Sequence, residues 1–170
     1  FFKGSLIGVP GLFKCWRKGN VGILNAVGTG IADDKVVYSY VNKMIVYYLG
    51  EQPVLNQVET YLCHDEIQKD YVIENISRLV VKPANASGGY GIMIGPKAPK
   101  EEREEVIKKI KKNPREYIAQ PLETLSTAPT ITKDDIEPRH LDLRPFILSG
   151  KSTYVTTGGL TRVALRKGST

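Results

Sequence analysis

The apolar positions in the first third of the chain predict a helix, a short strand and a second, longer helix. A helix is predicted over 10–17, and the apolar run 21–24 is typical of a short buried strand. The second helix is predicted over 35–49, because its apolar residues recur at intervals of three and four. Either Asp33 or Asp34 can cap the start of this helix.

The rest of the chain predicts neighbouring strands with helices placed between them. A connector is expected over 51–59, helices over 65–76 and 99–112, and irregular structure over 121–138. The predicted strands are 79–82, 92–94, 117–120, 140–148, 152–157 and 160–165. Strands and helices do not alternate strictly, so a doubly wound parallel sheet is disfavoured. We expect an α+β fold with a largely antiparallel sheet and flanking helices.

A glycine-rich loop connects two of these strands as a hairpin. Lys82 stands near the end of the first strand, and the loop contains Ser87-Gly88-Gly89-Tyr90-Gly91. Glycines let backbone N–H groups converge on an anion, Ser87 can add a hydroxyl donor, and Lys82 can supply a positive charge to phosphate oxygens. A plain hairpin turn, whose glycines only permit positive φ, accounts for these residues equally well.

Polar side chains alternate with leucines along the predicted strand 140–148. His140, Asp142 and Arg144 fall on one face, and two leucines fall on the other. Such a face can bind Mg-ATP, with the carboxylate directed to the metal and the guanidinium to a phosphoryl group. A half-exposed strand with a cross-strand salt bridge is the alternative.

Two common phosphate-binding motifs are excluded. Gly150-Lys151-Ser152 has the end of a P-loop motif, but Pro145 occupies the position of the required glycine. A dinucleotide-binding motif would need a third glycine after Gly28-Thr29-Gly30, where Asp33 stands instead.

Composition limits the class of protein without selecting a function. The 170 residues carry a net charge of +6, which suits an anionic partner such as a nucleotide, a nucleic acid or a membrane surface. No apolar run is long enough to span a bilayer, so a soluble protein without membrane contact is expected. Cys15 and Cys63 are the only cysteines, which favours a reducing, cytoplasmic setting.

Several motifs follow one another along nearly the whole chain. They are Leu6 to Leu12, Asn25 to Lys35, Val80-Val81-Lys82-Pro83, Ser87 to Gly91, Tyr117-Ile118-Ala119-Gln120-Pro121, Asp142-Leu143-Arg144 and Gly158 to Leu165. In this order they resemble the ATP-grasp superfamily, and specifically the circularly permuted ATP-grasp proteins, a bacterial group related to peptide and glutathionylspermidine-type ligases.

The resemblance implies a role for each matching residue. Lys35 and Lys82 would contact ATP phosphates, and Ser87, Gly88, Gly89, Tyr90 and Gly91 would form a flexible lid. The hinge that binds adenine through its backbone would be Gln120, Pro121 and Leu122. Asp142 would hold Mg²⁺, Arg144 would face the γ-phosphate, and Arg162 would lie near the acyl-phosphate or the acceptor.

The family implies an ATP- and Mg²⁺-dependent carboxylate–amine ligase that proceeds through an acyl-phosphate. We expect residues 1–60 to form a partial N-terminal α/β segment of the permuted core and 61–170 to form the nucleotide-binding region. The family's late Asn ligand to Mg²⁺ has no counterpart here, so an incomplete ligase is expected. The alternatives are a non-catalytic nucleotide- or partner-binding module and a basic nucleic-acid-binding domain, although no nucleic-acid-binding motif is present.

Overall fold

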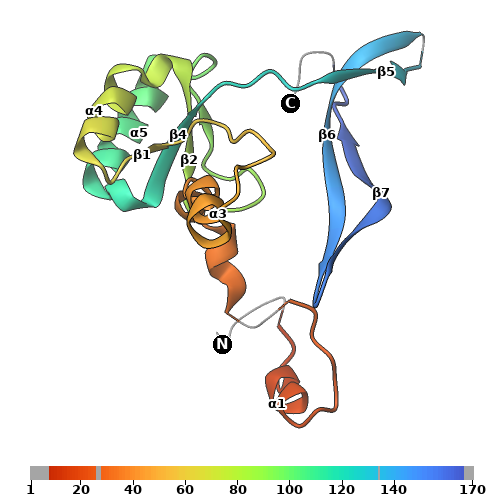
Figure 1. Cartoon of the computed structure of the whole chain (residues 1–170). Helices are drawn as coiled ribbons and strands as arrows, with labels where there is room; N and C mark the ends of the chain where they lie inside the picture. The colour runs from red at the N-terminus through yellow and green to blue at the C-terminus, as the bar shows by residue number, and fades with distance from the viewer. Residues whose placement is uncertain (1–7, 26–27, 134, 167–170) are drawn as a thin grey trace. The chain divides into compact units, whose positions relative to one another are not determined.

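The computed structural model describes residues 8–25, 28–133 and 135–166. The chain forms two compact units, Phe1–Pro121 and Leu122–Thr170 (Figure 1). The division expected at residue 60 concerns the parts of a permuted ligase core, and it stays a prediction.

The first unit contains a four-stranded sheet in the order β1-β4-β2-β3, with every neighbouring pair antiparallel. Its strands are β1 (Tyr61–Leu62), β2 (Leu79–Pro83), β3 (Met93–Ile94) and β4 (Tyr117–Pro121). Strands β2 and β3 are the two arms of the predicted glycine-loop hairpin, which is therefore confirmed as a hairpin.

The first unit also contains α-helices and short 3-10 turns. The α-helices are α1 (Leu12–Arg17), α2 (Lys35–Tyr38), α3 (Val41–Leu49), α4 (Glu66–Glu74) and α5 (Lys100–Lys112). The 3-10 turns are η1 (Thr29–Asp33), η2 (Ile76–Arg78) and η3 (Pro114–Glu116). Figure 1 shows α4 and α5 beside the strands that they cover.

The two faces of this sheet bury different helices because side chains alternate along each strand. On one face, Val81 of β2 packs in a buried cluster with Val72 of α4 and Ile110 of α5. On the opposite face, Ile118 of β4 packs with Val36 of α2. Polar side chains of β2 and β4 that share the α2 face are therefore kept apart from the main hydrophobic core.

The turn after β3 passes very close to neighbouring backbone. A Cβ atom on Gly95 would lie 2.0 Å from the carbonyl oxygen of Ile76 and 2.6 Å from that of Leu79. Gly95 N donates to the Leu79 carbonyl at 2.9 Å, so this close approach is part of the hydrogen-bonded structure. Glycine is required here by space and not by a positive φ.

The second unit is a three-stranded antiparallel sheet in the order β5-β6-β7. Its strands are β5 (Thr127–Ile131), β6 (Ile136–Ser149) and β7 (Thr153–Val163), and Figure 1 shows β6 and β7 as a long hairpin. Among the described residues, every buried apolar side chain belongs to the first unit. The apolar side chains of the β6–β7 hairpin are therefore exposed or half-buried.

The predicted fold class is confirmed, since all strand pairs are antiparallel and helices flank the first sheet. The strand predicted over 21–24 is wrong, because these residues form no regular element and Leu24 is exposed. The single helix predicted over 35–49 is divided at Ser39. Its hydroxyl donates to the Val36 carbonyl at 2.7 Å, and the backbone N–H groups of Ser39 and Tyr40 form tight three-residue turns.

Candidate functional site

Lys82 and Gln120 meet on the face of the first sheet that α2 covers. Lys82 is paired with Ile118 and Gln120 with Val80, so alternation places both polar side chains opposite the α4–α5 core. Lys82 Nζ donates to Gln120 Oε1 at 2.6 Å. Burial lowers the pKa of Lys82 below its usual value, and the positive charge of Lys35 lowers this pKa further.

Lys35 begins α2 and is bonded to the segment that leads into the glycine loop. Its backbone N donates to the Ala84 carbonyl at 2.8 Å, and its Nζ donates to the Ala86 carbonyl at 2.7 Å. Ala84 N in turn donates to the Glu116 carbonyl at 2.8 Å, next to β4. The amino groups of Lys35 and Lys82 are thus placed near the start of the same loop.

Asp34 fixes the start of α2 that carries Lys35. Its Oδ1 accepts a hydrogen bond from Val36 N at 2.8 Å, which is the geometry of an N-cap. Its Oδ2 accepts from the Arg115 guanidinium at 2.7 Å, and this bond is the main reason why the pKa of Asp34 is lowered. The structure therefore selects Asp34, and not Asp33, as the helix cap.

The glycine loop is exposed and its glycines adopt positive φ. The φ angles are 68° at Gly88, 79° at Gly89 and 71° at Gly91. Tyr90 is 80% exposed, and Ser87 is also exposed. Both sequence interpretations, a phosphate-covering lid and a plain turn, require these glycine conformations, so the geometry leaves both open.

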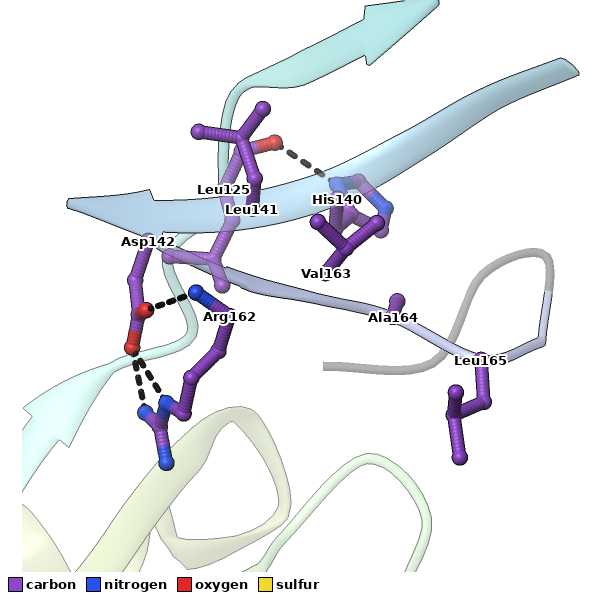
Figure 2. A pocket seen from close by; sticks show the side chains of 8 residues that line it. All are labelled: Leu125, His140, Leu141, Asp142, Arg162, Val163, Ala164 and Leu165. Carbon is purple, nitrogen blue, oxygen red and sulfur yellow. Dashed lines mark hydrogen bonds and ion pairs between the residues drawn. The ribbon is translucent and has the colours of Figure 1, made fainter. Parts of the chain in front are cut away.

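Asp142, Arg144 and Arg162 form a second group of charges in the second unit. Asp142 and Arg162 are opposite each other on β6 and β7. Arg162 donates from Nε to Asp142 Oδ2 at 2.8 Å and from its backbone N to Oδ1 at 3.1 Å, and its Nη2 also contacts Oδ2 (Figure 2). Arg144 Nε lies 3.5 Å from the same Oδ2. The Arg162 hydrogen bonds are the largest cause that lowers the pKa of Asp142 to about 2.

A shallow hollow of about 380 Å³ adjoins this ion pair. Figure 2 shows the ring of His140 directed toward the carbonyl of Leu125, and His140 Nδ1 lies 2.7 Å from that oxygen. The remaining lining residues are Leu141, Asp142, Arg162, Val163, Ala164 and Leu165. A charged end and an apolar end therefore share one open depression.

The predicted site residues form two groups, one in each unit. In the first unit, Lys35 and Lys82 lie near the start of the glycine loop, Gln120 accepts a hydrogen bond from Lys82, and Pro121 ends β4 beside Leu79. The second unit brings Asp142, Arg144 and Arg162 together, and Leu122 is exposed at its beginning.

Sequence reasoning did not identify Thr60, which accepts a hydrogen bond from Gln120 Nε2 at 2.9 Å. An isolated threonine before a two-residue strand gives no periodic signal, so this contact could only be found from the strand pairing. The structure therefore adds Thr60 to the residues around Lys82.

Asp142, the predicted ligand of Mg²⁺, does not belong to a cluster of acidic, His or Cys side chains in the described part of the chain. No three His, Cys, Asp or Glu side chains there are grouped closely enough to hold a metal ion. Both oxygens of Asp142 contact Arg162. A Mg²⁺ ion at Asp142 would have to displace this guanidinium and take its other ligands from nucleotide oxygens and water.

No helix within the described residues has the length and apolar character needed to cross a bilayer.

Comparison with known proteins gives one family and several long relatives. The model of the family described as circularly permuted ATP-grasp type 2 matches residues 1–164. An uncharacterised protein of Synechocystis sp. is 55% identical over 99% of this chain and 35% of its own length. An uncharacterised protein of Mycobacterium tuberculosis is 48% identical over 99% of this chain and 31% of its own length.

A further relative carries the name of an enzyme. A protein of Frankia casuarinae, provisionally named glutamate–cysteine ligase 2-2, is 47% identical over 95% of this chain and 19% of its own length. The chain thus spans about a third of the length of the first two relatives and about a fifth of the third.

Proposed function

Because the chain belongs to the circularly permuted ATP-grasp type 2 family, we propose that it supplies the ATP-binding lysines and lid of an ATP-dependent ligase. The proposed reaction joins a carboxylate to an amine, with the carboxylate activated as an acyl-phosphate. The name of the Frankia relative, a glutamate–cysteine ligase, belongs to this reaction class.

The observation that carries the proposal is the pair of lysine side chains near the start of the glycine loop. Among the ion pairs of the described residues, none involves Lys35 or Lys82. The positive charge of Lys35 disfavours the charged form of Lys82, which burial disfavours as well. A polyphosphate would relieve both effects, because its oxygens replace lost hydration and carry negative charge.

The other predicted residues would act on the phosphates and the activated carboxylate. The exposed loop from Ser87 to Gly91 would cover the triphosphate with backbone N–H groups, and the hinge at Gln120, Pro121 and Leu122 would contact adenine. Arg144 and Arg162 would stabilise negative charge that develops during phosphoryl and acyl transfer. Mg²⁺ would neutralise phosphate charge, with Asp142 as its proposed protein ligand.

Mg-ATP binding to the whole protein tests this proposal by isothermal titration calorimetry. We expect Lys35→Ala and Lys82→Ala each to raise the Kd by about tenfold or more, because each removes a charge-assisted hydrogen bond. Lys97→Ala is the matched control, since Lys97 is an exposed lysine of the same unit. Unchanged affinity in both lysine variants would contradict the proposal.

A non-catalytic nucleotide-binding module is the second candidate. The engagement of Asp142 by Arg162 favours it, because the proposed metal ligand is already paired with a cation. Phosphate release from Mg-ATP in the presence of pooled amino acids and amines separates the two candidates. Release that depends on both an acid and an amine supports the ligase, and ATP binding without any release supports the module.

A further inference from the structure

Gln120 is a buried polar side chain of the first unit, with 7% of its surface exposed. Both ends of its amide are hydrogen-bonded: Oε1 accepts from Lys82 Nζ at 2.6 Å, and Nε2 donates to Thr60 Oγ1 at 2.9 Å. A buried amide without partners is costly, so these two contacts determine how the side chain is held.

The direction of each hydrogen bond in the series Lys82–Gln120–Thr60 follows from which of the two groups can donate. A lysine ammonium can only donate, so the atom of Gln120 that faces Lys82 must be the oxygen. The nitrogen then faces Thr60, whose oxygen must accept. The Thr60 hydroxyl is free to donate onward, and it does so to the Val58 carbonyl at 3.0 Å.

Strand pairing places Thr60 beside Gln120. Tyr61 of β1 is paired with Ala119 and Leu62 with Ile118. Continued by one residue, the same antiparallel register sets Thr60 opposite Gln120. The sheet therefore fixes the distance between the hydroxyl and the amide, and Thr60 has no need to contact a ligand in order to influence Lys82.

We propose that Thr60 is a positioning residue for Lys82: its hydroxyl fixes the Gln120 amide with the oxygen toward the ammonium, which holds that ammonium ready for phosphate. This inference rests on the proposed function, since it assigns a support to one of the two proposed phosphate-binding lysines.

A neutral amide suits this task better than a carboxylate. Gln120 accepts a hydrogen bond from one of the three ammonium N–H groups and leaves the other two to donate to phosphate oxygens. Because the amide carries no net charge, it orients Lys82 without neutralising it. Loss of the Thr60 hydroxyl would let the amide rotate, and its NH₂ group could then face the ammonium and repel it.

The test compares Thr60→Val with Thr60→Ser in the whole protein by calorimetric titration with Mg-ATP. Valine keeps the shape and removes the hydroxyl, so we expect the Kd to rise about fivefold. Serine keeps the hydroxyl and should restore the wild-type Kd. Thr130→Val is the matched control, because Thr130 donates to the Ala128 carbonyl two residues earlier, as Thr60 does to Val58.

Repeating the Thr60→Val substitution in a Gln120→Met variant separates a positioning role of Thr60 from a general disturbance of the structure. In Gln120→Met the side chain keeps its length but has no amide, so adding Thr60→Val should cause no further loss of affinity. An equal fivefold loss in both backgrounds would overturn the inference, and so would an unchanged Kd in Thr60→Val while Lys82→Ala weakens binding. Thermal unfolding of each variant identifies any loss that is due to misfolding.

A measurement on the Gln120 amide without nucleotide tests the positioning role of Thr60 separately from the proposed function. We expect the side-chain NH₂ protons of Gln120 to exchange slowly with water in wild type and in Thr60→Ser, and quickly in Thr60→Val. The ¹⁵N–H₂ resonances of this side chain measure the rate. Failure of the wild-type protein to bind Mg-ATP would overturn the proposed function. Unchanged Gln120 exchange in Thr60→Val would overturn the positioning role of Thr60.

Discussion

At the scale of single residues, the protonation of Asp142 depends on Arg162. The guanidinium and the backbone N of Arg162 both donate to its carboxylate, and they hold its pKa near 2. Replacement by glutamine in Arg162→Gln removes the cation, so we expect the pKa of Asp142 to rise toward its ordinary value of about 3.9. A pH titration of the Asp142 carboxyl ¹³C resonance measures this change.

The same replacement should change how stability depends on pH. A carboxyl whose pKa is lowered by folding contributes stability above its unfolded pKa and loses this contribution as pH falls through its folded pKa. For Asp142 this stability is lost between about pH 4 and pH 2. Arg162→Gln should make this loss of stability smaller. Arg139→Gln is the control, because Arg139 is paired with Glu137. An unchanged Asp142 pKa in Arg162→Gln would contradict this explanation.

Strand alternation predicted part of this arrangement. It placed Asp142 and Arg144 on one face of the strand, and their contact in the structure agrees with that placement. The cross-strand salt bridge that the sequence left as an alternative is present, between Asp142 and Arg162. The partner could not be named beforehand, because the register of β6 on β7 depends on where the hairpin turns and on the register shift between Pro145 and Ile147.

At the scale of elements, the position of α2 depends on its cap. Asp34 bonds both to the first turn of α2 and to Arg115, so we expect Asp34→Ala to lower the free energy of unfolding by about 1 kcal/mol. Asp33→Ala should change it little, since Asp33 is exposed and the cap interaction belongs to Asp34. Urea unfolding at neutral pH measures both variants. Equal losses in the two variants would argue against the capping role.

The pKa of Asp34 adds a pH dependence to this prediction. Because folding lowers this pKa, chiefly through the Arg115 hydrogen bond, the stabilisation is present above the unfolded pKa and is lost as pH falls through the folded pKa. The difference between wild type and Asp34→Ala should therefore shrink in acid.

Sequence patterns located some elements closely, but they failed where a local turn or a distant partner decided the structure, as in the helix predicted over 35–49, which is divided at Ser39. The Lys- and Glu-rich segment 99–112 predicted α5 (Lys100–Lys112) to within one residue. The apolar run 21–24 finds no strand partner among the described residues, and a strand without a partner leaves its backbone groups unpaired. Strand β5 was missed because it contains Pro129, which is tolerated only because β5 is an edge strand.

At the scale of the whole molecule, the two units should differ in how easily their hydrogen bonds open. The first unit buries residues such as Ile118 and Ala119 of β4 completely, whereas Leu143 of β6 is 68% exposed. We expect backbone amides of β2 and β4 to exchange with deuterium much more slowly than those of β6 and β7, because burial of apolar contacts limits local opening. Hydrogen–deuterium exchange with mass spectrometry on this chain measures the difference. Equal protection of the two sheets would contradict it.

The overall composition could not anticipate this division into two units. Hydrophobic residues make up 41% of the chain, a value typical of one ordinary core. Only pairing and burial show that the buried apolar residues of the described part lie before residue 122, while the apolar residues of the second sheet are exposed or half-buried. A chain that spans about a third of the length of a relative can thus have an average composition although its buried residues lie in one unit.

The close approach at Gly95 sets a limit on how this sequence can diverge. Any side chain at that position would overlap two carbonyl oxygens of the neighbouring turn and strand, so substitution there requires the backbone of the β2–β3 hairpin to move. A Cβ atom on Gly22 or Gly30 would meet no atom within 4 Å, so space does not require glycine at these two positions. An invariant glycine at the position of Gly95 should therefore mark the sequences that retain this hairpin, even where the glycine loop itself has changed in length.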